Sequence, residues 1–228
     1  MNSIQAVIFD FDGTLAELTI DFSLMKRKVA ALAAGFLPEP PKPDDKPVLE
    51  WIDQLADQIA EYEGSEVGQE FHSRGRLVVT ATELDAARSG QLFHFSEGLL
   101  EHLAGLGVGR GIFTRNSMSA VRIVFPEISK HCEIFLPRED ARRVKPDPEH
   151  VHQMLETLGT PPEHTLVVGD YGMDIEAGRA AGCLTAGVLS GNMTRSVLRS
   201  FKPDFIEKNA DLLCRRLESE GLFQARTK

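Results

Sequence analysis

An apolar run near the start of the chain stops abruptly at two aspartates that are separated by one residue. The segment reads IQAVIFDFDGTL over residues 4–15, and its apolar part is typical of a strand buried on both faces of a parallel sheet. Gly13 and Thr14 end this strand, which leaves Asp10 and Asp12 at its carboxyl end, the edge where open α/β sheets bind ligands. Two carboxylates can lie close together there without a large energetic cost only if a cation or a shared proton offsets their repulsion. The segment therefore favours a metal site and phosphate chemistry, although the same residues also suit an ordinary turn.

The composition disfavours several classes of partner. Among 228 residues there are 34 Asp plus Glu against 25 Lys plus Arg, a formal net charge of −9, which argues against nucleic acid or an anionic membrane. No apolar run is long enough to span a bilayer, and too few residues precede Asp10 for a secretory signal. The three cysteines are scattered and odd in number, as expected for reduced packing residues. We therefore expect a cytoplasmic protein that binds neither nucleic acid nor membrane.

Residues 16–92 are expected to form a helical unit inserted after the first strand. Apolar residues recur at three- and four-residue steps from Phe22 to Phe36 and from Val48 to Tyr62, and a proline-rich loop separates these two segments. The segment 65–88 predicts one or two further helices, with an interruption near Gly75. No convincing strand pattern interrupts this stretch.

From residue 93 onward, predicted strands and helices alternate along the chain. Strands are expected at 108–114, 132–136, 165–169 and 184–189. Helices are expected at 99–106, 118–125, 148–158, 172–181 and 209–217. This alternation is typical of an α/β fold with a doubly wound parallel sheet. We expect a core domain made of residues 1–15 and 93–228, with residues 16–92 as an all-helical domain over the carboxyl edge of the sheet.

Two of the later segments carry residues suited to binding an anion. The strand GIF leads to Thr114, Arg115 and Asn116, and a hydroxyl beside the N–H groups of a helix start forms an anion-binding cradle. Ser117 would cap that helix whether or not an anion binds there. Lys145 precedes a proline that fixes the local backbone, so its ammonium is suited to neutralising a phosphoryl oxygen or a carboxylate. A lysine in solvent is the ordinary alternative.

A second acidic pair follows the strand TLVVG. Asp170 comes almost directly after it, and Asp174 follows one helical turn later, so both would face the edge of the sheet that carries Asp10. Helix capping and stabilisation by the helix dipole would also account for such a pair. Acidic pairs, a hydroxyl and a lysine at the strand ends of one sheet together favour a single phosphate site.

On these motifs the chain resembles the haloacid dehalogenase-like hydrolase superfamily. The motifs occur in the family's order: DFDGT at 10–14, the strand-end Thr114, Lys145 within VKPDP, and GDYGMD at 169–174. The helical insertion lies where the phosphoglycolate phosphatase-like branch carries its cap, so the resemblance covers nearly the whole chain. It implies a Rossmann-like core domain with an inserted helical cap that closes over the site.

The resemblance also implies a two-step phosphoryl transfer. Asp10 would attack phosphorus and form an aspartyl-phosphate, while Asp12 would protonate the leaving alkoxide and then activate water. Mg²⁺ would be held by Asp10, by the backbone carbonyl of Asp12 and by Asp170. Asp174 would contribute to the metal site directly or through a neighbouring ligand.

The phosphoryl oxygens would be bound by the residues that follow the second motif and by the lysine. Thr114 and Lys145 have this role by resemblance, and Lys145 would also restrain Asp10. Arg115 stands where many relatives carry asparagine, and Asn116 comes one place later. Arg115 is suited to a bidentate contact with substrate, or it could point into solvent. We include both Arg115 and Asn116 in the expected phosphate-binding group.

The second aspartate of the first motif narrows the range of activities expected within the superfamily. In the superfamily, dehalogenases lack this second acid and transport ATPases carry threonine there, so Asp12 favours a phosphatase or a phosphomutase. The leading hypothesis is a Mg²⁺-dependent phosphatase that hydrolyses a small phosphorylated metabolite resembling phosphoglycolate. A phosphomutase of the β-phosphoglucomutase type is the alternative, and a non-catalytic binding module on the same fold is less expected. We expect a monomer or a homodimer.

Overall fold

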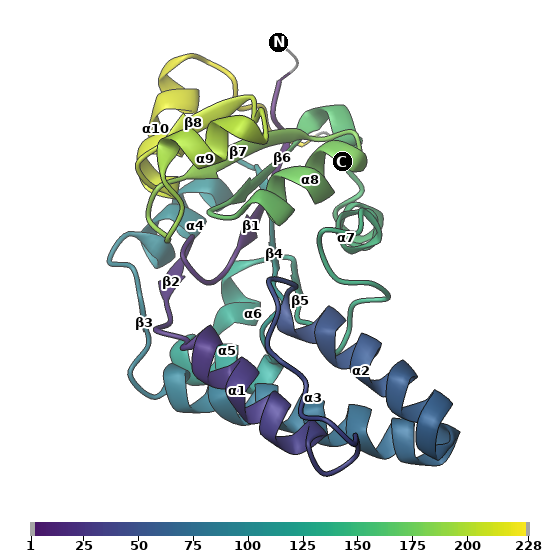
Figure 1. The fold of residues 1–228 in the computed structure, drawn as a ribbon. Coiled ribbons are helices and arrows are strands. Elements are labelled where there is room, and N and C mark those ends of the chain that lie inside the picture. Colours follow the sequence, from purple (N-terminus) through teal and green to yellow (C-terminus); the bar gives the residue numbers. More distant parts are fainter. Residues whose placement is uncertain (1–2, 227–228) are drawn as a thin grey trace. The chain divides into compact units, whose positions relative to one another are not determined.

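The computed structural model describes residues 3–226, which fall into two compact units (Figure 1). Thr19–Ser89 form one unit, and the residues on either side of this segment form the other. The short strands β2 (Ala16–Glu17) and β3 (Gln91–Leu92) pair antiparallel, with Ala16 opposite Leu92. Because of this pairing, residues 16–18 and 90–92 belong to the sheet-containing unit, whereas the sequence pattern had assigned them to the helical one. Strands of two residues are too short to give a periodic pattern.

A six-stranded parallel sheet forms the centre of the sheet-containing unit. Its strands are β1 (Ala6–Asp10), β4 (Gly109–Phe113), β5 (Ile134–Leu136), β6 (Thr165–Gly169), β7 (Leu184–Val188) and β8 (Phe205–Glu207). They lie in the order β5-β4-β1-β6-β7-β8, and every neighbouring pair is parallel. All five residues of β1 are buried, as its continuous apolar sequence predicts. The chain builds outward on one side of β1 and then on the other, so the strand order reverses beside β1, where α/β sheets bind ligands.

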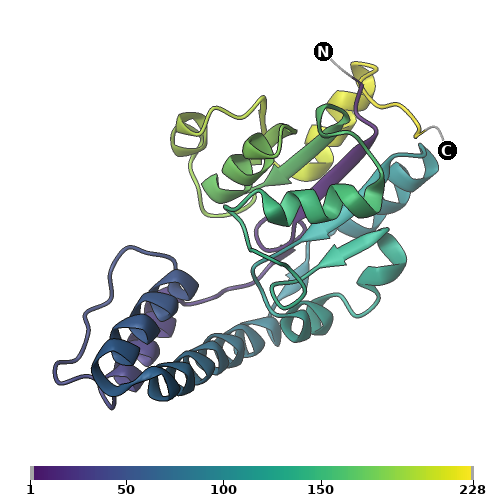
Figure 2. The same ribbon diagram turned by 90° about the vertical axis from the view of Figure 1, so that its right-hand side faces the viewer.

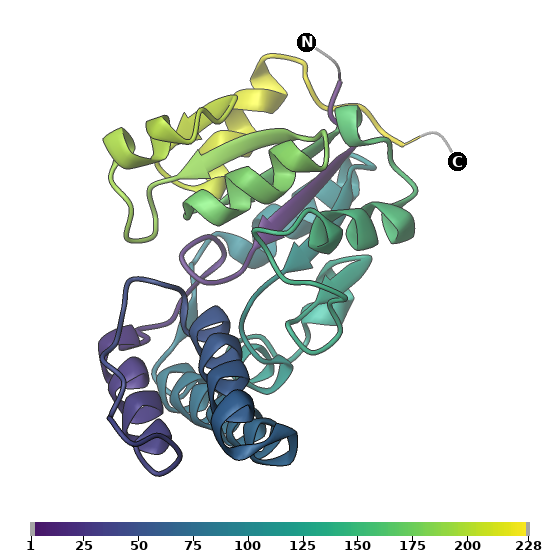
Figure 3. The same ribbon diagram turned by 45° about the vertical axis from the view of Figure 1, so that its right-hand side comes forward.

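Helices cover both faces of this sheet. They are α4 (Ser96–Gly105), α5 (Met118–Val124), α6 (Ile128–His131), α7 (Glu149–Leu158), α8 (Gly172–Ala180), α9 (Arg195–Ser200) and α10 (Ala210–Ser219), with a 3₁₀ turn at Pro162–His164. Figures 1 and 3 show α7 and α8 on one face and α4 with α10 on the other. The core between the sheet and α7 includes Ile8, Val151 and Met154, all fully buried. The expected α/β class with a doubly wound parallel sheet is confirmed, whereas β8, α6 and α9 had not been expected.

The helical unit, Thr19–Ser89, consists of three helices with a core of their own. They are α1 (Phe22–Ala33), α2 (Val48–Glu63) and α3 (Ser65–Ala87), and Figure 2 shows α2 and α3 side by side. Met25, Ile52 and Phe71 belong to one buried apolar cluster. The expected interruption near Gly75 is wrong, because α3 is continuous and Gly75 faces Ile52, where an added Cβ would lie 3.1 Å from Cγ2. This glycine allows two helices to approach closely.

No helix among residues 3–226 combines the length and the apolar character that crossing a membrane requires. The role of the helical unit as a cap stays a prediction.

Candidate active site

Asp10 is the last residue of β1, and the turn that follows it fixes the first motif. The residue is only 6% exposed. Gly13 has φ +80°, a left-handed conformation that glycine adopts without strain, and its N–H donates to the carbonyl of Ala16 at 2.7 Å. Asp12 Oδ1 accepts a hydrogen bond from the Leu18 N–H at 2.9 Å. The glycine turn therefore presents both carboxylates beyond the end of the strand.

The Lys145 ammonium lies between two of the predicted acidic residues. It donates to Asp10 Oδ1 and, at 2.5 Å, to Asp174 Oδ1, and its side chain is almost fully buried. Its Nζ also lies 4.2 Å from the centroid of the Phe113 ring, a distance at which the ring face attracts a cation. Lys145 is therefore not a lysine in solvent, the ordinary alternative considered from the sequence.

Three carboxylates converge at this point. Oxygen atoms of Asp10, Asp170 and Asp174 lie within 4.8 Å of one another, and all three residues are buried. Glycines make room for Asp170, since a Cβ on Gly13 would lie 2.5 Å from its Oδ2 and one on Gly191 would overlap the same atom. The sequence had predicted the three aspartates but not Gly191, whose signal was its place just after the end of β7.

Burial and neighbouring charges raise the pKa of Asp10, Asp12 and Asp170. Burial, opposed by Lys145, raises the pKa of Asp10 to about 6. Burial, assisted by the charges of Asp10 and Asp174, raises the pKa of Asp170 from 3.8 to about 9. The pKa of Asp12 rises to about 7, mainly through burial. Burial alone would lower the pKa of Lys145, but Asp10 and Asp174 together raise it. The lysine therefore stays charged, and the cluster retains more negative charge than this one cation neutralises.

The residues present fit a magnesium ion. Carboxylate oxygens are the hard ligands that Mg²⁺ prefers, and a divalent cation would offset the burial and the mutual repulsion that raise the pKa of Asp10 and Asp170. Among the described residues, these two and Asp174 are the group of metal-capable side chains that converge. The Asp12 carboxylate is not in that group.

The second motif forms a hydrogen-bonded turn after β4. Thr114 is 1% exposed, and its Oγ1 accepts from the Asn116 N–H at 3.1 Å. Ser117 caps α5 by accepting from the Ala120 N–H at 3.3 Å. Asn116 is also buried, and its Nδ2 has no hydrogen-bond partner among residues 3–226. A buried donor of this kind is costly unless a ligand or water satisfies it, which suits a site that binds an anion.

Arg115 makes a contact that had not been expected from the sequence. Its Nη1 donates to the backbone carbonyl of Lys145 at 2.6 Å, and its side chain is half-buried. It therefore joins the turn after β4 to the loop that carries the lysine.

Comparison with known proteins identifies the family of this chain. The family described as haloacid dehalogenase-like hydrolase matches residues 7–188. The chain belongs to this family. The pyrophosphatase PpaX of Bacillus cereus is 30% identical over 217 residues, which are 92% of this chain and 95% of that protein. The predictions of family membership and of a hydrolase are confirmed.

Several solved structures share the fold of this chain. A hydrolase from Pseudomonas syringae has a TM-score of 0.67 at 20% identity, with 94% of this chain and 98% of that chain covered. A protein described as a predicted phosphoglycolate phosphatase from Haemophilus somnus has a TM-score of 0.63 at 19% identity, with 95% and 99% covered. At such identities the likeness extends to the fold alone.

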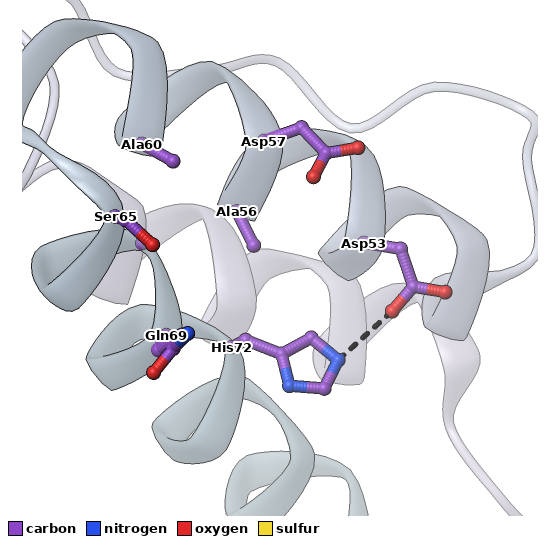
Figure 4. A pocket seen from close by; sticks show the side chains of 8 residues that line it. Asp53, Ala56, Asp57, Ala60, Ser65, Gln69 and His72 are labelled. Carbon is purple, nitrogen blue, oxygen red and sulfur yellow. Dashed lines mark hydrogen bonds and ion pairs between the residues drawn. The ribbon is translucent and has the colours of Figure 1, made fainter.

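The helical unit of this family member contains a groove of its own, of about 370 Å³ between α2 and α3. Figure 4 shows a hydrogen bond between two of the residues that line it, His72 Nε2 and Asp53 Oδ1, at 3.0 Å. Asp57 also lines the groove but makes no metal-capable group of three with these residues. The groove therefore does not compete with the acidic cluster as the candidate site.

Proposed function

We propose that this chain is a Mg²⁺-dependent phosphatase that acts on a small phosphorylated metabolite through an aspartyl-phosphate on Asp10. The observation that carries the proposal is the buried Lys145 ammonium, which contacts both Asp10 and Asp174 beside the buried Asp170. A lysine held against a carboxylate orients it, and the same cation lies where the charge of a transferred phosphoryl group has to be neutralised.

The proposed reaction uses two carboxylates in turn. An oxygen of Asp10 attacks phosphorus, the bond to the leaving oxygen breaks, and Asp12 supplies the proton that this oxygen takes up. Asp12 then accepts a proton from water as the water attacks the phosphoenzyme, which releases phosphate and restores the Asp10 carboxylate. A pKa of about 7 suits Asp12 to both roles near neutral pH.

The remaining groups bind the phosphoryl oxygens and the metal. We assign the phosphoryl oxygens to Thr114, Asn116 and Lys145, and we assign Arg115 to the support of Lys145 because of its contact with that backbone. The metal would be held by the carboxylates of Asp10 and Asp170 and the backbone carbonyl of Asp12, with Asp174 beside them. When bound, Mg²⁺ supplies positive charge to the phosphoryl oxygens.

The substrate class has two candidates. The sequence resemblance favours a phosphomonoester similar to phosphoglycolate. The curated relative at 30% identity is named a pyrophosphatase, which favours inorganic pyrophosphate as the second candidate. Both present a phosphoryl group to the same residues, and they differ only in the leaving group, so a direct comparison of kcat/KM separates them.

The test is a phosphate-release assay over a panel of phosphorylated metabolites and pyrophosphate, with Mg²⁺ or with EDTA. We expect turnover only with Mg²⁺, its loss in Asp10→Asn, and its retention in Asp45→Asn, which changes an exposed aspartate in the loop before α2. Undiminished turnover in Asp10→Asn would refute the nucleophile. No turnover together with no Mg²⁺ binding would instead indicate a non-catalytic module.

A phosphomutase is distinguished by the fate of the phosphoenzyme. A phosphatase transfers the phosphoryl group from Asp10 to water, whereas a mutase passes it faster to a sugar phosphate. Single-turnover measurement with and without a sugar phosphate therefore decides between the two, and we expect hydrolysis to dominate.

A further inference from the structure

A chain of hydrogen bonds joins the two loops that carry the proposed phosphoryl-binding residues. The carbonyl of Leu136, at the end of β5, accepts from the Thr114 N–H at 3.1 Å. It also lies 3.2 Å from Nε2 of His150, whose Nδ1 accepts from the Lys145 N–H at 3.2 Å. The Leu136 carbonyl can only accept and the Lys145 N–H can only donate, which fixes the proton of His150 on Nε2.

Two arginines complete the connection from the other side. Arg115 Nη1 donates to the Lys145 carbonyl at 2.6 Å. Arg138 Nη1 in turn donates to the Arg115 carbonyl at 2.7 Å, while the Arg138 N–H donates to the Asn116 carbonyl at 3.3 Å. Arg138 is only 6% exposed, unusual burial for an arginine. The bonds thus form a closed ring that runs from Thr114 to Lys145 and back.

We propose that Arg115, Arg138 and His150 are positioning residues that set the place of the Lys145 ammonium relative to the Thr114 hydroxyl. They do so by holding main-chain groups of both loops. The inference rests on the proposed function, in which Lys145 and Thr114 bind the phosphoryl group.

The need for such support follows from where Lys145 lies. It belongs to the irregular segment between β5 and α7, so no sheet ladder or helix holds its backbone. A lysine side chain has four flexible torsions, and its Nζ can be placed accurately only if its backbone is fixed. Side chains hold this backbone on both sides: His150 accepts from its N–H and Arg115 donates to its carbonyl.

The properties of His150 suit this role. It is fully buried, its ring packs against Phe113 at 5.1 Å between centroids, and it lies against the backbone of the lysine. Burial and the Lys145 ammonium lower the pKa of His150 to about 3. The ring therefore stays neutral, and Nδ1 stays an acceptor, over the pH range in which the enzyme is expected to work.

The test compares Arg115→Met and Arg115→Lys with Arg226→Met. Arg226 is the matched control because it also donates to a backbone carbonyl, that of Leu158 at 3.1 Å, but lies outside the ring. We measure kcat/KM on several phosphate esters and the affinity for inorganic phosphate by calorimetry. Displacing a catalytic group by about 1 Å costs about 100-fold. We expect Arg115→Met to lower kcat/KM by about 10- to 100-fold, by the same factor for every ester.

Phosphate affinity should fall by a similar factor, Arg115→Lys should recover part of the loss, and Arg226→Met should change neither quantity. In a Lys145→Met background, Arg115→Met should have little further effect, because residues that act through one another are not additive. Arg138→Lys repeats the test should Arg115→Met fail to fold.

Three results would overturn the proposal. A loss that depends on the leaving group would make Arg115 a direct substrate contact. Full additivity with Lys145→Met would show that Arg115 acts independently of the lysine. Unchanged phosphate affinity in a folded Arg115→Met would remove the positioning role. Failure of the proposed function is recognised separately, since a wild-type protein that binds phosphate but hydrolyses nothing still allows phosphate affinity to be compared across the variants.

Discussion

Replacing Asp170 by asparagine should stabilise the metal-free protein while destroying its metal site. Burial and the neighbouring carboxylates raise the pKa of Asp170 from 3.8 to about 9. Between these values the folded protein binds a proton that the unfolded chain releases. Stability from this group is therefore fully present below about pH 4 and is lost as the pH rises towards about 9.

The size of this effect follows from the difference in pKa. One pKa unit corresponds to about 1.4 kcal/mol, and pH 7 lies about three units above the ordinary pKa of aspartate. Because Asp170 must take up a proton when the chain folds, it lowers the free energy of unfolding by about 4 kcal/mol at pH 7. At pH 5 the same effect is under about 2 kcal/mol. Asparagine has nearly the same shape and carries no charge, so Asp170→Asn should raise the free energy of unfolding by about 2–4 kcal/mol at pH 7.

The assay is urea unfolding in EDTA at pH 5, 7 and 8.5, for the wild type, Asp170→Asn and the control Asp45→Asn, which changes an exposed loop residue. The advantage of Asp170→Asn should grow with pH, and Asp45→Asn should follow the wild type. Added Mg²⁺ should stabilise the wild type but not Asp170→Asn, because a ligand stabilises only the state that binds it. An Asp170→Asn variant that is no more stable than the wild type at any pH would refute the inference that the carboxylates repel one another in the metal-free site.

Three further outcomes are expected. Asp12→Asn should lower kcat by about 10²- to 10⁴-fold. The fall in kcat/KM, which reports the step that expels the leaving group, should be smaller for p-nitrophenyl phosphate, whose leaving group needs no proton; an equal fall in kcat/KM for all esters would contradict a general acid. Gly191→Ala should weaken Mg²⁺ binding by at least about tenfold in a calorimetric titration, because its Cβ would overlap the Asp170 carboxylate, whereas Gly98→Ala, with open space around it, should not. Burial raises the pKa of all three thiols, so none should react with a thiol reagent at pH 8 until the protein is unfolded, and rapid labelling of the native protein would contradict their burial. These thiols belong to Cys132, Cys183 and Cys214.

The part of the site that could be predicted from the sequence is the part fixed by the sheet. Asp10 lies opposite Phe113 in the register of β1 and β4, so the next residue after Phe113, Thr114, necessarily lies near Asp10. β6 flanks β1 on the other side and brings Asp170 to the same edge. In a parallel sheet, a polar residue that directly follows an apolar strand therefore lies at the carboxyl edge, close to the residues that follow the neighbouring strands.

Features that depend on irregular segments could not be predicted in this way. Lys145 was identified by its motif, but the sequence did not show that its backbone contacts the side chains of His150 and of the distant Arg115. No local pattern connects these residues. Similarly, β8 and α9 have 3 and 6 residues, too short for a periodic pattern to stand out. The continuous α3 was missed near Gly75 because a glycine that permits helix packing and one that ends a helix are the same residue in a sequence.

Asp174 shows why the ordinary and the functional explanations of a motif need not compete. Its Oδ2 accepts from the Tyr171 N–H at 3.0 Å, which is the capping role, while its Oδ1 receives the Lys145 ammonium at 2.5 Å. A carboxylate has two oxygens, and the one that holds the helix start fixes the direction of the other. Capping therefore supplies the rigidity that the charged contact requires. The same reasoning applies to Ser117, which caps α5 and so fixes the turn that carries Thr114. At the strand ends of this sheet, a residue that begins a helix is well placed to hold a ligand group in position.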